Sequence, residues 1–185
     1  MGDPGTKEVF RLEDLQATGT RKMGRKHVLS ILVENEPGVL ARISGLFARR
    51  GYNINTLAVG PTDDENISRI TMTIDGAEHP IDQVTKQLHK LIHVLKIRDL
   101  EPEDTVAREL ALLKVDADAH TRQEVSQLAE IFGGRIVDVA RRSVTVELTG
   151  SEEKIEAFEE LLKPFGLIEM VRTGEIAVQR GRSET

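Results

Sequence analysis

The chain has 185 residues, of which 39% are apolar and 30% are charged, and its formal net charge is −6. This composition is typical of a globular protein of two small domains, and its acidic balance argues against general nucleic-acid binding, which needs a concentrated basic face. The absence of cysteine excludes a disulfide, a thiolate metal ligand and a cysteine nucleophile.

The N-terminal stretch, residues 1–24, has little apolar periodicity and is expected to form a flexible tail. The basic cluster at 21–26 is expected to be a solvent-exposed segment that precedes the first strand, rather than a nucleic-acid-binding arm. The stretch lacks the apolar segment of a secretory signal, and no apolar run in the chain approaches the ~20 residues that span a bilayer. We therefore expect a cytoplasmic protein with no membrane attachment.

Residues 25–101 alternate between strand and helix patterns. Near-continuous or alternating apolar residues predict strands, and apolar residues three and four apart predict helices. Pro37 suits the first position of a helix and Gly51 its end, whereas Pro80 suits the start of the next helix. The patterns predict strands at 27–33, 52–59, 70–74 and 94–100, and helices at 37–50 and from Pro80 with an apolar stripe reaching Leu95.

Residues 101–104 form a short polar link, and the same order of strands and helices recurs after it, within residues 102–185. Each unit reads β-α-β-β-α-β over about 75 residues, which predicts an α+β fold of two ferredoxin-like units. Units of this size bury only ~60% of their unfolded surface, and open sheet faces and edges invite pairing with a second copy. We therefore expect a homodimer. The second unit is predicted to close with a strand from Ile168 to Val178.

The segment Glu34–Val39 joins the first strand to the first helix. A helix N-terminus presents backbone N–H groups without intrahelical partners, and Gly38, which has no Cβ, allows close approach to them. Asn35 adds an amide that donates and accepts. Such a joint can hold the carboxylate of a free amino acid. The alternative is that Asn35 only caps the helix and Gly38 only allows close packing.

The equivalent joint of the second unit, residues 116–121, has no glycine and carries two aspartates. Two carboxylates would repel a carboxylate ligand, so we expect no second site there.

Two sequence blocks resemble one family. Residues 34–54, together with 61–64 and 68–69, resemble the small regulatory subunit of acetolactate synthase (acetohydroxyacid synthase), whose first domain is an ACT domain. Residues 130–139 resemble that family's C-terminal domain. The resemblance extends over about residues 25–182, and it implies an ACT domain at 25–101 and a second ferredoxin-like domain at 102–185.

The family's role follows from the resemblance. It implies a non-catalytic subunit that activates a large catalytic subunit and confers feedback inhibition by a branched-chain amino acid, typically valine, in valine, leucine and isoleucine biosynthesis. Thiamine diphosphate, Mg²⁺ and FAD would belong to the large subunit, so this chain would carry no cofactor, metal or catalytic residue.

The resemblance also implies an effector site at the interface of two side-by-side ACT domains. It would take Asn35, Gly38, Val39 and Leu40 from one subunit, and Asn53 and Ile54 from its neighbour. The asparagines would receive the ligand ammonium group, the N–H groups near Gly38 its carboxylate, and the apolar side chains its hydrocarbon part. The residue types leave open that Asn53 and Asn55 are only edge-strand polar residues.

Other readings compete. An ACT-type regulator of another enzyme fits the first unit. An acylphosphatase can share the fold but needs an arginine beside the loop, and an RNA-binding module needs aromatic platforms. His89 and His93 stand four apart on the predicted helix, as a metal pair would, although solvent-facing histidines are expected. Asp63, Asp64 and Glu65 are expected to form a solvated turn, which could touch the catalytic subunit.

Overall fold

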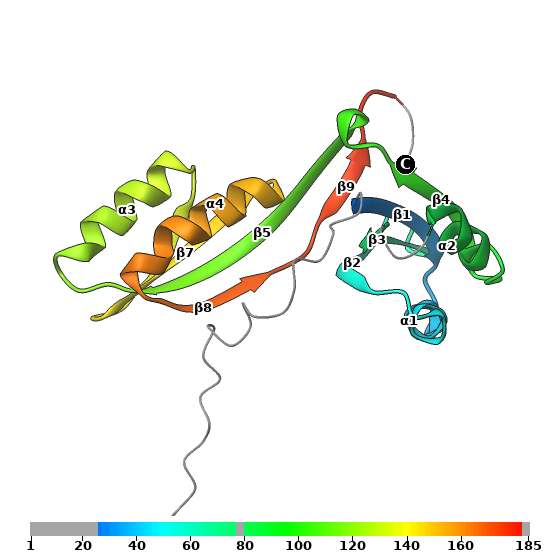
Figure 1. Cartoon of the computed structure of the whole chain (residues 1–185), viewed down its shortest axis with the longest axis horizontal. Helices are drawn as coiled ribbons and strands as arrows, with labels where there is room; N and C mark the ends of the chain where they lie inside the picture. The colour runs from blue at the N-terminus through cyan, green and yellow to red at the C-terminus, as the bar shows by residue number, and fades with distance from the viewer. Residues whose placement is uncertain (1–25, 77–79, 183–185) are drawn as a thin grey trace, which may run out of the picture.

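The computed structural model describes residues 26–76 and 80–182, so the tail expected at 1–24 lies outside the described residues. Figure 1 shows two lobes joined by long strands. The first lobe contains β1 (Lys26–Glu34), α1 (Val39–Arg50), β2 (Ile54–Pro61), β3 (Ile67–Asp75), α2 (Ile81–Leu88) and β4 (Val94–Leu100). The second contains β5 (Thr105–Asp116), α3 (Thr121–Ile131), β6 (Arg135–Val139), β7 (Ser143–Gly150), α4 (Glu152–Leu162), β8 (Leu167–Arg172) and β9 (Ile176–Gln179). Short 3-10 turns lie at Pro102–Asp104 and Lys163–Phe165.

The first lobe is an antiparallel sheet in the order β2-β3-β1-β4. The buried apolar residues of β1 and β3 alternate along each strand, because the period of a strand is two and one sheet face meets the helices. The helices contribute apolar stripes to the same core. Its members that are at most 1% exposed are Leu29, Ile31, Ile43, Phe47, Ile70, Met72, Val84 and Leu88.

The second lobe repeats this plan in the order β6-β7-β5-β8. Figure 1 shows α3 and α4 lying together on one side of the sheet. Phe132 and Phe158 stack with ring centroids 5.1 Å apart in its core. The predicted α+β class, with two ferredoxin-like units, is confirmed.

The second helix is shorter than predicted. α2 ends at Leu88, and His89 is its C-cap, so the prediction of a helical stripe reaching Leu95 was wrong. Leu91 and Val94 still pack against the core from the turn and from β4. Their contacts preserve an apolar spacing that resembles a continuing helix, although the backbone has already turned.

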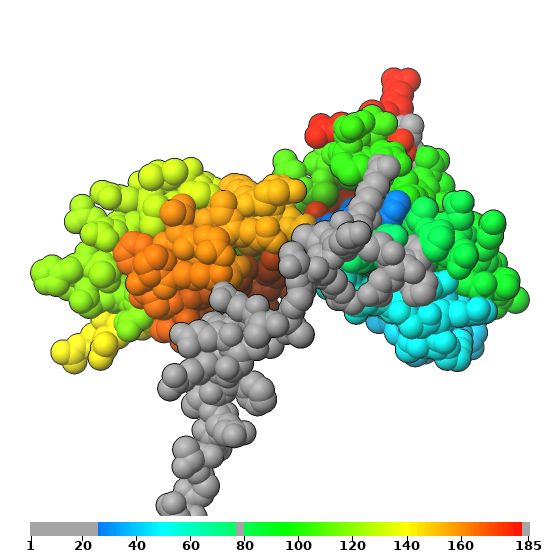
Figure 2. Space-filling model, in the orientation of Figure 1, coloured from blue at the N-terminus to red at the C-terminus, as the bar shows by residue number. Residues whose placement is uncertain are grey.

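The closing strand is broken, so the prediction of one strand from Ile168 to Val178 was wrong. After β8 the chain turns at Thr173–Glu175, and β9 pairs with the first four residues of β5, outside the main sheet. β9 also contacts β1 and β4 of the first lobe. In the space-filling view the red residues near the C-terminus lie beside the green residues around 100 (Figure 2).

Gly174 makes this turn possible. Its φ is +80°, and a Cβ there would lie 3.0 Å from Cβ of Thr56 on β2. Both the left-handed backbone and the close approach exclude larger residues. The link between β8 and β9 therefore passes directly against the first lobe.

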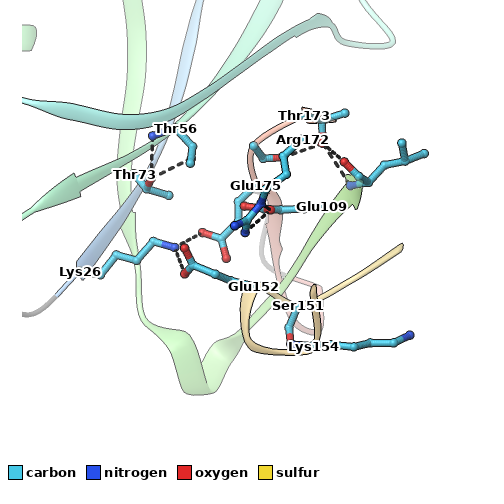
Figure 3. Close-up of polar contacts among 12 residues, drawn as sticks. Lys26, Thr56, Thr73, Glu109, Ser151, Glu152, Lys154, Arg172, Thr173 and Glu175 are labelled. Carbon is cyan, nitrogen blue, oxygen red and sulfur yellow. Dashed lines mark hydrogen bonds and ion pairs between the residues drawn. The ribbon is translucent and has the colours of Figure 1, made fainter. Parts of the chain in front are cut away.

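Charged side chains join the lobes (Figure 3). Lys26 forms ion pairs with Glu152 and, at 3.1 Å, with Glu175. Burial alone would lower the pKa of Lys26, but its hydrogen bonds and ion pairs with these two carboxylates outweigh burial and raise the pKa above its ordinary value. Nearby, Nε of Arg172 donates to Oε2 of the fully buried Glu109 side chain at 2.7 Å.

Candidate functional site

The loop before α1 presents an open helix N-terminus. Gly38 is the N-cap, with φ +88°, and a Cβ added there would meet no atom within 4 Å. The N–H of Arg42 donates to the Gly38 carbonyl at 3.0 Å, which starts the helical ladder. By helix geometry the amides of Leu40 and Ala41 precede that ladder and have no intrahelical partner. Open space and directed N–H groups together suit a small anion.

Asn35 holds the loop against the β2–β3 turn. Its Nδ2 donates to the Glu65 carbonyl at 2.8 Å, and its backbone N–H donates to the Asn66 carbonyl at 2.7 Å. Gly38, not Asn35, occupies the N-cap, and no side chain caps α1. The interpretation of Asn35 as only a helix cap is therefore wrong. The helix also begins at Val39, two residues later than Pro37, which was predicted as its first residue.

The two apolar residues after Gly38 have different environments. The Val39 side chain is 5% exposed and belongs to the core, so only its backbone faces the loop. Leu40 is 41% exposed. Leu40 is thus the apolar side chain of this segment that is available to a ligand.

Asn53 and Ile54 lie at the other end of the sheet. Ile54 pairs with Ile74 of β3, which pairs with His27 near the start of β1, whereas Glu34 ends that strand. The two halves of the predicted site are therefore about 20 Å apart along β1, at ~3.3 Å per residue. One chain does not bring them together.

Asn53 itself is exposed just before β2, an edge strand, and its Nδ2 donates to Oδ1 of Asn55 at 3.1 Å. Three clefts of about 550, 500 and 430 Å³ are described, and none is lined by any of the six predicted site residues. The two groups of predicted site residues thus lie on separate surfaces of the single chain.

His93 departs from its predicted place. α2 ends before His89, so His89 and His93 do not share a helix face. The His93 side chain is 18% exposed, and its Nδ1 lies 2.5 Å from Oε2 of Glu34. His93 is therefore not the solvent-facing residue that was expected, whereas His89 is exposed.

Within the described residues, one group brings three possible metal-donor side chains together: Glu34, Glu36 and His93, with one atom each within 4.8 Å of the others. However, the Nη1 of Arg42 lies 2.5 Å from Nε2 of His93. Because a guanidinium only donates, Nε2 must accept, and the ring proton then lies on Nδ1, which faces Glu34. The contacts describe a series of hydrogen bonds that runs from Arg42 through His93 to Glu34.

Hydrogen bonds within the acidic turn after β2 stabilise its conformation. Oδ1 of Asp64 accepts hydrogen bonds at 2.9 Å from both the backbone and the side-chain nitrogen of Asn66. Asp63 and Glu65 are exposed. These contacts and exposures support the predicted solvated turn.

The equivalent loop of the second unit is occupied by its own side chain. Oδ1 of Asp118 accepts from the N–H groups of His120, at 2.8 Å, and Thr121, at 3.0 Å. The hydrogen bonds from Thr121 and His120 lower the pKa of the Asp118 carboxyl below its ordinary value. The amides that would receive a ligand carboxylate here already hold one.

Asp118→Asn is expected to destabilise the protein at pH 7, because the neutral amide accepts these hydrogen bonds less strongly than the carboxylate. The pKa of Asp118 is lowered on folding from an ordinary value of 3.8, so its contribution is complete above that value. It is lost as the pH falls through the folded-state pKa. Urea unfolding of both proteins should therefore show a difference at pH 7 that shrinks toward pH 2.5. A difference that stays constant with pH would contradict the assignment.

The fold and the open loop define a class of protein: one that pairs an ACT domain with a second ferredoxin-like unit. The family profile described as the AHAS small subunit-like ACT domain, where AHAS is acetohydroxyacid synthase, matches residues 29–96. The profile described as the small subunit of acetolactate synthase matches residues 108–181.

Curated relatives agree. The chain is 48% identical over 155 residues to the acetolactate synthase small subunit of Mycolicibacterium smegmatis, covering 84% of this chain and 91% of the relative. It is 51% identical over 156 residues to the probable acetolactate synthase small subunit of Methanothermobacter thermautotrophicus, covering 84% of this chain and 93% of the relative.

A solved structure agrees as well. The crystal structure of the acetolactate synthase small subunit from Thermotoga maritima superposes with a TM-score of 0.79 at 42% identity, covering 86% of this chain and 99% of that one. The chain therefore belongs to the acetolactate synthase small-subunit family. No helix among the described residues is long and apolar enough to cross a membrane.

Proposed function

We propose that this chain activates the acetolactate synthase catalytic subunit and makes it sensitive to a branched-chain amino acid, with valine as the first candidate. The observation that carries the proposal is the glycine-capped, open N-terminus of α1. In this proposal the chain performs no chemistry. Thiamine diphosphate, Mg²⁺ and FAD belong to the catalytic subunit.

Sheet geometry explains how two copies would complete the site. β2 is an edge strand, and edge strands can pair with a second copy. β2 runs parallel to β1, because both are antiparallel to β3. Two-fold pairing of β2 with its copy would reverse one strand, so that the start of one β2 lies beside the end of the other. Asn53 of one subunit would then approach the loop of its neighbour.

In this dimer the ligand carboxylate would meet the N–H groups after Gly38. Its ammonium group would meet the side-chain oxygens of Asn35 and of Asn53 from the neighbouring subunit, and Leu40 and Ile54 would border its side chain. A ligand that bridges two subunits can favour one dimer arrangement over another, and couplings of ~1–3 kcal/mol are typical of such effects.

We also propose that the ACT domain comprises residues 25–101 and the second domain residues 102–185. The division falls at the 3-10 turn Pro102–Asp104, between the two matched family profiles. The second domain has its own core, and its self-filled Asp118 loop supports a role other than effector binding.

Calorimetric titration of the chain with valine, leucine and isoleucine tests the effector. We expect one bound ligand per chain, hence two per dimer, with the tightest binding for valine. Absence of heat with all three would overturn the proposed effector class.

The partner is tested separately, by adding the chain to the catalytic subunit with and without valine. We expect higher activity without valine and inhibition with it. If valine bound but activity did not change, the chain would instead be an ACT-type regulator of another enzyme.

A further inference from the structure

His93 completes a chain of hydrogen bonds around the candidate loop. Its Nδ1 lies 2.5 Å from Oε2 of Glu34, the last residue of β1, and its Nε2 lies 2.5 Å from Nη1 of Arg42 in α1. Its carbonyl accepts from the Glu34 N–H at 3.0 Å, and the Arg42 N–H donates to the Gly38 carbonyl at 3.0 Å. This series of hydrogen bonds therefore connects the strand before the loop, through the imidazole, to the first turn of the helix after it.

The contacts define the protonation state of the ring. Arg42 can only donate, so Nε2 accepts, and Nδ1 carries the proton that is donated to Glu34. This is neutral histidine. A protonated ring has an N–H on both nitrogens, so Nε2 could no longer accept, and two cations would face each other.

Within residues 26–76 and 80–182, three charged groups lie near the ring. Glu34 and, at 3.8 Å, Glu36 favour its positive form, whereas Arg42 opposes it. Protonation would strengthen the attraction to the strand side and break the link to the helix side. The hydrogen-bonded link from Arg42 through His93 to Glu34 therefore exists only with the neutral ring.

We propose that His93 is a positioning residue for the effector loop: its neutral ring fixes α1 relative to the end of β1, and its protonation releases the helix and weakens valine binding. The inference rests on the proposed function, since it concerns the regulation of the same site. Because protonation of the ring removes the acceptor that Arg42 needs, the protonated form would bind valine more weakly than the neutral form.

Two substitutions separate positioning from titration. Glutamine carries a donor and an acceptor on one planar group, so His93→Gln can imitate the neutral ring without changing charge. Leucine can make neither hydrogen bond. The full chain and both variants are titrated calorimetrically with valine at pH 8.0 and pH 5.5.

We expect the affinity of the wild-type chain to fall about fivefold or more at pH 5.5, which is the lower end of typical coupling between sites. His93→Gln should bind within about twofold of wild type at pH 8.0 and lose most of the pH dependence. His93→Leu should bind several-fold more weakly at both pH values. The matched control is His89→Gln, at an exposed histidine four residues earlier, which should retain the wild-type pH dependence.

The opposite results have distinct meanings. If His93→Gln kept the full pH dependence, or if His93→Leu bound valine as tightly as wild type at pH 8.0, the role of His93 would be overturned and the proposed function would stand. If the wild-type chain bound none of valine, leucine and isoleucine at pH 8.0, the proposed function itself would be overturned.

A ligand-independent measurement also tests the contacts. Imidazole ¹⁵N spectra at pH 8.0 should show His93 protonated on Nδ1, and Arg42→Ala should shift its tautomer balance toward protonation on Nε2. A wild-type ring protonated on Nε2 would overturn the inference whatever valine does.

Discussion

Replacing Gly38 by aspartate is expected to abolish valine binding and valine inhibition while the chain still raises the activity of the catalytic subunit. The new carboxylate would project into the open space at the helix N-terminus and occupy the amides that the ligand needs. At ~4 Å, two like charges near a protein surface repel by about 4 kcal/mol, so we expect affinity to fall by about 100-fold or more. Calorimetry and inhibition assays measure the loss.

Two controls separate charge from backbone strain. Gly38→Ala introduces the same left-handed strain without a carboxylate and should reduce affinity much less than Gly38→Asp. Gly133→Asp places the same residue at another positive-φ glycine, after α3, and should bind valine as wild type does. Normal valine inhibition of the Gly38→Asp protein would show that the site lies elsewhere.

Mixing two variants that are each expected to lose valine binding tests whether the site is shared between subunits. Gly38→Asp damages the loop half and Asn53→Ala the strand half. A mixed dimer would combine the intact loop of one chain with the intact Asn53 of the other, and so regain one site of two. Recovery of valine binding in the mixture is expected. Failure to recover it, with mixed dimers demonstrated, would contradict a shared site.

Arg172→Met is expected to lower the free energy of unfolding by on the order of 3 kcal/mol. The substitution would leave the Glu109 carboxylate, whose side chain is fully buried, without its ion-pair partner. Removing one member of a buried pair is costly, whereas replacing both by apolar residues is often tolerated. The double variant Glu109→Leu/Arg172→Met should therefore be more stable than Arg172→Met alone. Urea unfolding followed by circular dichroism provides the comparison.

A surface ion pair offers the control. Arg135 contacts Glu147, but its side chain is 78% exposed, so solvent screens the pair and Arg135→Met should destabilise the protein much less than Arg172→Met does. Equal losses for Arg172→Met and Arg135→Met would mean that burial of Glu109 does not determine the effect.

The order of elements could be predicted from the sequence because apolar spacing determines which residues face a core. Phe47 and Leu88 lie where their helical stripes place them, and Ile70 where its strand does. The ends were harder. The predicted second helix was too long because residues in the turn after α2 are still apolar. The predicted closing strand was continuous because, apart from Gly174, nothing in its pattern marks the turn at Thr173–Glu175.

The loop of the candidate site could be found from the sequence because glycine and asparagine stand between a strand and a helix. Its surroundings could not. His93 lies 59 positions after Glu34, and only the pairing of β1 with β4 brings them together. Glu109 was equally hidden, since a charged residue within a strand is usually solvent-exposed, and no local pattern identifies a distant arginine partner. Whether the six predicted residues bind an effector stays a prediction.

The pairing of β5 with β9 affects the order in which the chain can assemble. The strands of the first sheet end at Leu100, but β9, which lies against β1 and β4, spans Ile176–Gln179. During synthesis the first domain can fold as soon as it emerges, since domains generally fold as units from the N-terminus. Its contacts with β9 must wait until the whole second domain has been translated. During this interval a nascent chain therefore exposes a surface that β9 covers in the finished protein.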